Sequence, residues 1–182
     1  MKVELTTWEL EMLDREQLRP KIIQHPSLTI QQAEVPCPEF SRFLYASVGG
    51  DWYWSDRLTW TYEQWDTYLK HRNVETWVAY VSGTPAGYCE LEAQSEGNIE
   101  IVYFGLLRQF IGQGLGGHLL TVGIEQAWNM GANRVWVHTC SLDGPHALKN
   151  YESRGFTLYN TKVSVIEIAD KPPGPWDGAS QT

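Results

Sequence analysis

Four glycines stand within six residues in the run Ile111-Gly112-Gln113-Gly114-Leu115-Gly116-Gly117. Glycine loses the most backbone entropy when it is fixed, so the run predicts a loop and not the interior of a helix or strand. Glycine also permits positive φ angles and close backbone approach, so several N–H groups can turn toward one anion. A helix-like segment from about 115 to 130 follows, and its positive end attracts the same charge. The run therefore predicts a phosphate or diphosphate site.

His138, Cys140 and His146 also carry side chains that could do chemistry. Their spacing is uneven and a fourth ligand is missing, so we expect no metal site. Cys140 is a poor candidate nucleophile, because side chains two apart on a strand point the same way without necessarily touching. His138 near the end of a strand is a candidate substrate-binding residue and a second candidate base, since its pKa lies near neutrality. A packed histidine is the alternative interpretation.

The elements that must position these residues follow from hydrophobic periodicity. Residues 5–15 predict a strand followed by a turn, and 41–46 and 62–72 predict helices, the second with Thr61 as N-cap and Gln64 completing a capping box. Residues 76–81 and 86–91 flank a Ser-Gly-Thr-Pro turn and predict an antiparallel hairpin. Further strands are expected at 98–104, 134–139 and 156–168, with a short helix at 146–153.

The strands at 98–104 and 134–139 are joined by the helix that follows the glycine run, so we expect them to be parallel. The fold class is therefore α/β (α+β): a mixed, mostly antiparallel twisted sheet flanked by helices, with a central βαβ unit that carries the phosphate loop. We expect one domain over residues 1–170. Residues 171–182 are rich in proline and glycine and predict a flexible C-terminal tail.

Composition narrows the class of protein. The net charge of -8 disfavours a nucleic-acid partner, which needs a basic face. The segment 1–19 contains five acidic residues, unlike a signal peptide, and no apolar run is long enough to cross a membrane. Three widely spaced cysteines are typical of reduced thiols. We therefore expect a cytoplasmic protein without a membrane partner.

Two other phosphate-binding architectures fit less well. A nucleoside-triphosphate loop needs a lysine and a serine or threonine after its last glycine, and no lysine follows here. Gly112-x-Gly114-x-x-Gly117 matches the dinucleotide fingerprint, but the next strand ends in Val137-His138-Thr139 where an acidic residue should hold the ribose. The hairpin upstream also differs from the repeated βαβ units of that fold. A dinucleotide-binding oxidoreductase is thus the weaker alternative.

Two elements in the order seen here resemble the GCN5-related N-acetyltransferase superfamily, whose members transfer acetyl from acetyl-CoA to an amine. The family loop Arg/Gln-x-x-Gly-x-Gly/Ala aligns with the segment 111–116, where Ile111 replaces the Arg or Gln; the register that starts at Gln109 satisfies it literally. The family helix Ala-x-x-x-Tyr-x-x-x-Gly-Phe aligns with residues 147–156. An asparagine often found seven residues before the tyrosine is Gly144 here.

The resemblance implies a set of acetyl-CoA contacts. The diphosphate would meet the loop residues Ile111, Gly112, Gln113, Gly114, Leu115, Gly116 and Gly117. Leu106 and Leu107 would offer backbone N–H and C=O groups to the pantetheine arm, which binds like an added strand. Asn150 is a further candidate contact. No metal is expected to take part.

The resemblance also implies the catalytic residues. Tyr151 would lie near the thioester sulfur and protonate the departing thiolate, with a packed tyrosine as the alternative. Glu100 resembles the glutamate of the histone-acetylating branch and is the first candidate base, with an exposed strand glutamate as the alternative. Strict alternation would place Glu100 on one face with Val102 and Phe104 unless a bulge intervenes.

The acceptor region follows from the same resemblance. The segment 51–65 is dense in tryptophan and tyrosine and lies where the family covers its acceptor site. Aromatic faces beside Asp51 and Asp56 suit an amine, and Tyr53 and Trp54 are the expected pocket residues. A plain hydrophobic core is the alternative for at least half of these rings.

Together these features predict an acetyl-CoA-dependent N-acetyltransferase that acts on a primary amine of a small molecule or peptide. A non-catalytic acyl-CoA-binding module on the same fold is the alternative from another class. The sequence leaves open the identity of the acceptor and the formation of a homodimer.

Overall fold

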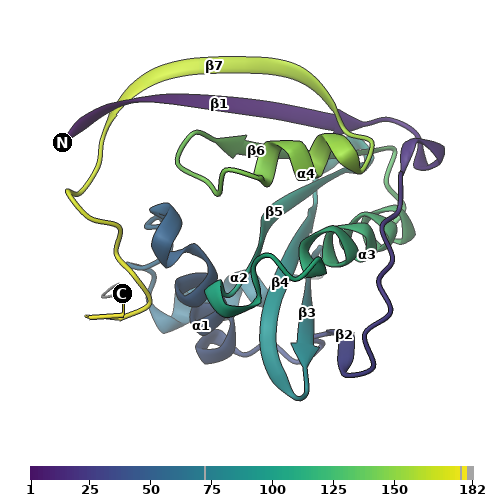
Figure 1. Ribbon diagram of the computed structural model, residues 1–182, viewed down its shortest axis with the longest axis horizontal. Helices are drawn as coiled ribbons and strands as arrows, with labels where there is room; N and C mark the ends of the chain where they lie inside the picture. Colours follow the sequence, from purple (N-terminus) through teal and green to yellow (C-terminus); the bar gives the residue numbers. More distant parts are fainter. Residues whose placement is uncertain (72, 177, 180–182) are drawn as a thin grey trace.

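Seven strands form a single mixed sheet in the computed structural model, which describes residues 1–71, 73–176 and 178–179. The strands lie in the order β2-β3-β4-β5-β6-β1-β7 (Figure 1). Their bounds are β1 Lys2–Met12, β2 Leu28–Gln32, β3 Val74–Val81, β4 Thr84–Ala93, β5 Asn98–Leu106, β6 Arg134–Cys140 and β7 Thr157–Glu167. All neighbours are antiparallel except β5 and β6, as the sequence predicts.

Four helices flank the sheet: α1 Pro38–Gly49, α2 Tyr62–Leu69, α3 Leu115–Asn129 and α4 Ala147–Ser153. The capping box predicted for α2 is present, because Gln64 N donates to Thr61 Oγ1 at 3.2 Å and Thr61 N donates to Gln64 Oε1 at 2.8 Å. The helix ends at Leu69, three residues before the predicted end, and residue 72 lies outside the described residues.

The core is divided between the two faces of the sheet. Neighbouring residues of β4 show the division, because Tyr88 packs with Leu44 and Val48 of α1 whereas Cys89 packs with Leu120 of α3. The α3 face carries the larger cluster and also receives α4 through Tyr151. Helices thus cover both faces of the central strands, from which the glycine loop departs.

The hairpin and the βαβ unit both form as predicted. Between β3 and β4 the chain turns through Ser82 and Gly83, whose φ angles are 51° and 82°. Such positive values at both central residues match the twist of a two-residue hairpin turn. The helix α3 then carries the chain from β5 to the parallel strand β6.

The strand β1 occupies a place that periodicity alone could not assign. It pairs with β6 on one side and β7 on the other, so the start of the chain lies inside the sheet and not at an edge. Figure 1 shows β1 and β7 as a long ribbon at one end of the molecule. The edge strand β2 was missed by the sequence reading, although Leu28 and Ile30 alternate along it.

The segment after β7 returns toward α1. Gly174 is buried, and its N–H donates to Gly50 O at 2.9 Å. A Cβ at Gly50 would lie 2.5 Å from the carbonyl carbon of Gly174, so the close approach requires glycine. The predicted tail 171–182 therefore includes a residue fixed against α1, while 177 and 180–182 lie outside the described residues.

Candidate active site

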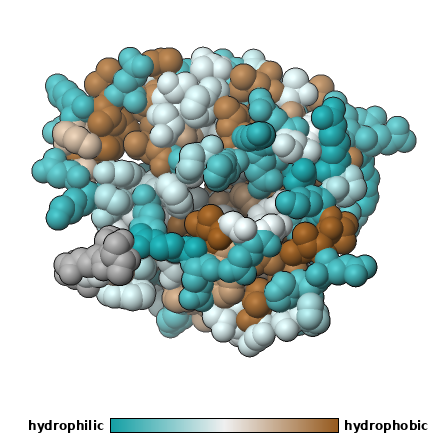
Figure 2. Space-filling model, viewed as in Figure 1, coloured by the Kyte–Doolittle hydropathy of each residue, from teal (hydrophilic) through white to brown (hydrophobic). Residues whose placement is uncertain are grey.

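A cleft opens where β5 and β6 separate. The two strands are paired only from Asn98 to Ile101 on β5 and from Arg134 to Val137 on β6. Beyond these pairs the cleft has a volume of about 1080 Å³ and is lined by β5, the glycine loop, α4 and the α1–α2 connection. The space-filling view shows a recess near its centre, between the positions of α4 and the start of α3 (Figure 2).

A bulge in β5 decides which side chains face the cleft. Glu90 is opposite Tyr103 and Leu91 is opposite Ile101, so Val102 is the additional residue. Ile101 and Phe104 consequently both pack toward α3, while Tyr103 packs toward α1. The simple alternation of Glu100 with Val102 and Phe104 is therefore wrong, because the bulge shifts the side-chain parity.

The glycine loop forms one wall of the cleft. Gly112 and Gly114 have φ angles of 84° and 81°, which side chains other than glycine rarely adopt. Gly114 is the N-cap of α3 and offers no side-chain acceptor, so the first N–H groups of the helix remain available to an anion. The loop residues that line the cleft are Ile111, Gly112, Gly114, Gly116 and Gly117.

Three predicted cofactor residues, Leu107, Gln113 and Leu115, are absent from the lining of the cleft. Leu115 is buried in the core, and Gln113 Nε2 donates to Gln109 O at 2.7 Å. Leu107 N donates to Ala86 O and Leu107 O accepts from Phe110 N, both at 2.9 Å. Both backbone groups of Leu107 thus already make hydrogen bonds within the protein, whereas Leu106, the other residue expected to contact the pantetheine arm, lines the cleft.

Tyr151 lines the cleft from α4. Its ring makes edge contacts with Phe104 at 6.0 Å and with Phe156 at 6.1 Å between ring centroids, and only 5% of the residue is exposed. Burial raises the pKa of Tyr151 well above its ordinary value, so the hydroxyl keeps its proton. Asn150 lines the cleft beside it.

Glu100 and His138 form a pair. Nδ1 of His138 lies 3.2 Å from Oε1 of Glu100, while Oε2 of Glu100 accepts a 2.7 Å hydrogen bond from Gln94 Nε2. Trp136 Nε1 donates to Gln94 Oε1 at 3.1 Å and so fixes the amide of Gln94. The sequence prediction ranked Glu100 before His138, but His138 is the member of the pair that lines the cleft.

The electrostatics of this pair are set by the glutamate. The hydrogen bond that His138 donates to Glu100 raises the pKa of His138, an effect that burial opposes and that the charge of Glu100 reinforces. Glu100 is 10% exposed by its side chain, whereas His138 is 49% exposed. The carboxylate can therefore orient the imidazole through Nδ1 and leave Nε2 to exchange a proton with a substrate.

Aromatic residues of the α1–α2 connection line the other end of the cleft, together with Asp56. Trp54 lies 4.8 Å from Tyr103 and 5.6 Å from Tyr45 between ring centroids, and its Nε1 donates to Asp143 Oδ1 at 3.4 Å. Tyr53 lines the same end and has a φ angle of 60°. Both predicted pocket residues are thus brought to the cleft.

Asp51 does not join that group. Its carboxylate accepts hydrogen bonds from Arg108 at 2.6 and 2.9 Å and forms a bidentate ion pair, and neither residue lines the cleft. Asp143 was not foreseen. It accepts from the Thr139 hydroxyl at 2.6 Å and from Cys140 N at 2.9 Å, and so fastens the loop after β6 to Trp54.

Sequence reasoning also missed three basic residues of the cleft, Lys21, Lys149 and Arg154. Lys21 lies in the connection between β1 and β2, and no sequence motif there links it to the glycine loop. Arg154 could have been found, because it immediately precedes the Gly155-Phe156 pair that identifies the helix.

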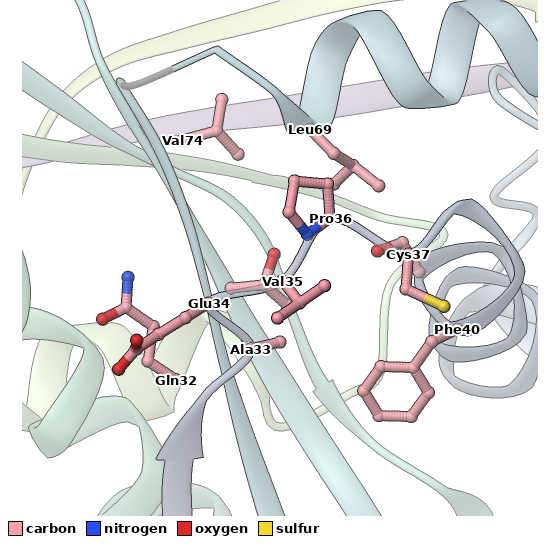
Figure 3. Close-up of a pocket in the computed structure, with 11 residues that line it drawn as sticks. Gln32, Ala33, Glu34, Val35, Pro36, Cys37, Phe40, Leu69 and Val74 are labelled. Carbon is pink, nitrogen blue, oxygen red and sulfur yellow. The ribbon is translucent and has the colours of Figure 1, made fainter.

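A second hollow lies under the connection between β2 and α1 and is lined by Val35, Cys37, Phe40 and Leu69 (Figure 3). Its volume of about 60 Å³ has room for a few water molecules, not for a nucleotide. The large cleft is thus the candidate active site.

No three His, Cys, Asp or Glu side chains in the described ranges are grouped as metal ligands. Within the same part of the chain, no helix has the length and apolar character needed to span a bilayer.

Comparisons with known proteins agree with this geometry. The model of the acetyltransferase (GNAT) family matches residues 31–156. A mycothiol acetyltransferase from Corynebacterium aurimucosum is 30% identical over 139 residues, which are 64% of this chain and 45% of that protein.

Solved structures share the fold. A GCN5-related N-acetyltransferase from Kribbella flavida superposes with a TM-score of 0.65 at 20% identity, over 93% of this chain and 58% of the other. A GCN5-related N-acetyltransferase from Sphaerobacter thermophilus superposes with a TM-score of 0.63 at 17% identity, over 88% of this chain and 50% of the other. The chain thus spans about half the length of these relatives.

Proposed function

This chain belongs to the acetyltransferase (GNAT) family, and from that premise we propose that it transfers an acetyl group from acetyl-CoA directly to a primary amine of a small molecule or peptide. One observation carries the proposal: the glycine loop, Tyr151 and His138 all line the same cleft. A group that binds phosphate, a proton donor and a proton acceptor thereby face one space, as amide formation from a thioester requires.

The cleft fits acetyl-CoA in chemical character. The loop and the first turn of α3 supply N–H donors for the diphosphate. These donors remain available because the N-cap residue, Gly114, has no side chain to accept from them. The edge of β5 at Leu106, where β6 has diverged, offers a place for the extended pantetheine arm. The acetyl group would then lie near Tyr151.

His138 is the proposed base. An alkylamine has a pKa of about 10.4 and is almost wholly protonated at neutral pH, so it must lose a proton before it can attack. Nε2 of His138 would accept that proton while Nδ1 remains hydrogen-bonded to Glu100. Glu100, the first candidate in the sequence, then acts as the residue that orients His138.

Tyr151 is the proposed acid. As the amine nitrogen bonds to the carbonyl carbon, the carbon–sulfur bond breaks and CoA leaves as a thiolate. The Tyr151 hydroxyl would give its proton to that sulfur, and solvent would later restore it. Burial keeps the hydroxyl protonated at neutral pH, which makes it a donor and not a base.

The aromatic end of the cleft is the proposed acceptor pocket. Trp54 and Tyr103 present ring faces close to each other, and Asp56 adds negative charge. Such surroundings favour a cationic amine over an anionic acceptor.

The first test combines binding with turnover. Calorimetry should show binding of acetyl-CoA and not of NAD, and a panel of primary amines should release free thiol from acetyl-CoA in the presence of the protein. Binding of acetyl-CoA without thiol release from any amine would instead support a non-catalytic binding module. Binding of NAD alone would overturn the assignment.

Tyr151→Phe tests the acid. We expect kcat to fall about 10- to 100-fold with acetyl-CoA affinity nearly unchanged, because the ring packing remains and only the proton is lost. Tyr62→Phe is the matched control, since Tyr62 is 63% exposed on α2 and absent from the cleft. Equal kcat values for the two variants would remove Tyr151 from the acid role.

A further inference from the structure

Beyond His138 the cleft continues along one face of the strands β6, β1 and β7. On β6, Cys140 lies two residues after His138 and therefore on the same face. Thr7 of β1 is opposite Cys140, and Leu5 follows Thr7 on that face. On β7, Ile166 shares this face, because the residue two before it is paired with Leu5. All five residues line the cleft.

The apolar side chains of this strip are shielded in part but not packed into the core. Leu5, Ile166 and, in the loop after β6, Leu142 are half-buried. In the part of the chain that the structure describes, none of them belongs to the three hydrophobic clusters or packs against one. On the other face of β7, Val163 and Val165 are 62% and 69% exposed and do not line the cleft. The apolar surface within the cleft is therefore available to an apolar ligand.

The loop after β6 adds an aromatic ring and few free polar groups. A Cβ placed on Gly144 would lie 3.5 Å from Cζ2 of Trp52, so the indole packs against this loop, and both residues line the cleft. Gly144 has no side chain that could bind a polar group of a ligand. The carboxylate of Asp143 already accepts hydrogen bonds from the Thr139 hydroxyl and from Cys140 N.

We propose that the acceptor is an amine with an apolar body, an alkyl chain or an aromatic ring, whose amino group meets His138 and whose body lies along Leu5 and Ile166. The assignment of this ligand as acceptor rests on the proposed function; the apolar strip does not. A polyhydroxylated amine would lose hydrogen bonds to water at this surface without replacing them. Leu5 and Ile166 lie outside the residues 31–156 that the family model matches, so membership of the family does not predict this preference.

Thiol release from acetyl-CoA with four primary amines tests the inference: propylamine, hexylamine, 1,6-diaminohexane and glucosamine. We expect kcat/KM to rise up to about fourfold for each methylene that the strip buries, which makes hexylamine about tenfold or more better than propylamine. Glu167 borders the cleft and would favour the diamine if a second positive charge were recognised. If the diamine or glucosamine reacted as well as hexylamine, the inference would be overturned and the proposed function would stand.

The variants Ile166→Ser and Leu5→Ser assign the preference to the strip. Each should lower the ratio of kcat/KM for hexylamine to that for propylamine about five- to tenfold. This ratio does not depend on the fraction of folded protein, so a loss of stability cannot imitate the effect. Val165→Ser, one residue from Ile166 but on the other face of β7, is the matched control and should keep the wild-type ratio.

Two further outcomes would be decisive. A wild-type ratio in both Ile166→Ser and Leu5→Ser would overturn the inference alone. Absence of thiol release with every amine would overturn the proposed function and the inference together.

Discussion

Two pairs on the α1 side of the sheet, each of a carboxylate with a basic side chain, differ in their access to solvent. On β4, Glu90 pairs with Arg57 at 2.8 Å, and the side chains are 2% and 8% exposed. On β5, Glu100 pairs with His138 at 3.2 Å, and the imidazole is 49% exposed. The pairs use similar chemistry, but only the second opens into the cleft.

The surroundings of Arg57 explain the first pair. Its guanidinium lies over the rings of Tyr68, Trp60 and Tyr103 at 4.2, 4.6 and 4.6 Å from their centroids. Burial alone would lower the pKa of Arg57, but the carboxylate of Glu90 raises it. Burial raises the pKa of Glu90, while Arg57 and the hydroxyl of Tyr68 oppose that rise. This pair is sealed by aromatic rings, so it holds the α1–α2 connection to the sheet and exchanges no proton with a ligand.

The comparison teaches where catalysis can occur on this sheet. Glu90 lies where β4 is paired on both sides and covered by α1 and α2, so water and substrate are excluded. His138 lies just past the last pair between β5 and β6. The separation of two strands, and not the presence of a carboxylate, distinguishes the pair that opens into the cleft from the buried one.

Breaking the sealed pair should have the largest effect. Arg57→Met leaves Glu90 buried without its partner and should lower the free energy of unfolding by about 3–5 kcal/mol, measured by denaturant titration. The double variant Arg57→Met with Glu90→Leu should recover much of the loss, because the uncompensated charge is gone. If the single variant were as stable as the wild type, the pair would not be the structural one.

Breaking the Glu100–His138 pair, which opens into the cleft, should lower the reaction rate more than the stability of the fold. His138→Gln removes the base and should lower kcat/KM about 10²- to 10³-fold, with the midpoint of thermal unfolding shifted little because the side chain is half exposed. His71→Gln, at an exposed position outside the cleft, is the matched control. A variant that keeps most of the wild-type rate would assign proton removal to solvent.

Weakening the Glu100–His138 pair should produce the smallest change in the reaction rate, and this change should be clearest in the pH dependence of the rate. Glu100 raises the pKa of His138, and the base works only when deprotonated, so the wild-type rate should rise with pH through a value above the ordinary 6.5. Glu100→Gln should move this limb toward lower pH and reduce the plateau up to about tenfold. An unchanged pH profile would separate Glu100 from the titration.

The raised pKa of His138 also predicts a small pH-dependent effect on the free energy of unfolding. Because the folded pKa of His138 lies above the unfolded one, the pair stabilises the fold fully below the unfolded pKa, and this contribution is lost as the pH rises through the folded pKa. The difference in unfolding free energy between the wild type and Glu100→Gln should therefore be larger at pH 5 than at pH 9.

Local signals in the sequence predicted most of the elements. Thr61 and Gln64 fix the start of α2 through contacts three residues apart, and the Ser82-Gly83 turn fixes the hairpin in the same way. The glycine run and Tyr151 are likewise local features, because the loop conformation and the short helix each depend on neighbouring residues.

What the sequence could not predict depends on contacts between distant segments. The bulge at Val102 arises from the pairing of β5 with β4, and it decides that Glu100 faces away from Phe104. Lys21 reaches the glycine loop through Thr121, a hundred residues further on. Hydrophobic periodicity predicts neither relation, because it shows only which side chains of one segment lie on the same face.

The position of β1 between β6 and β7 also limits the order in which the strands can pair. Synthesis delivers β1 before both of its neighbours, and more than 120 residues separate the end of β1 from the start of β6. Until then its hydrogen-bonding edges are unpaired while β3, β4 and β5 can already assemble through local turns. Both edges of β1 can be paired only once β6 and β7 have been synthesised, so this end of the sheet depends on contacts that span most of the distance between β1 and β7.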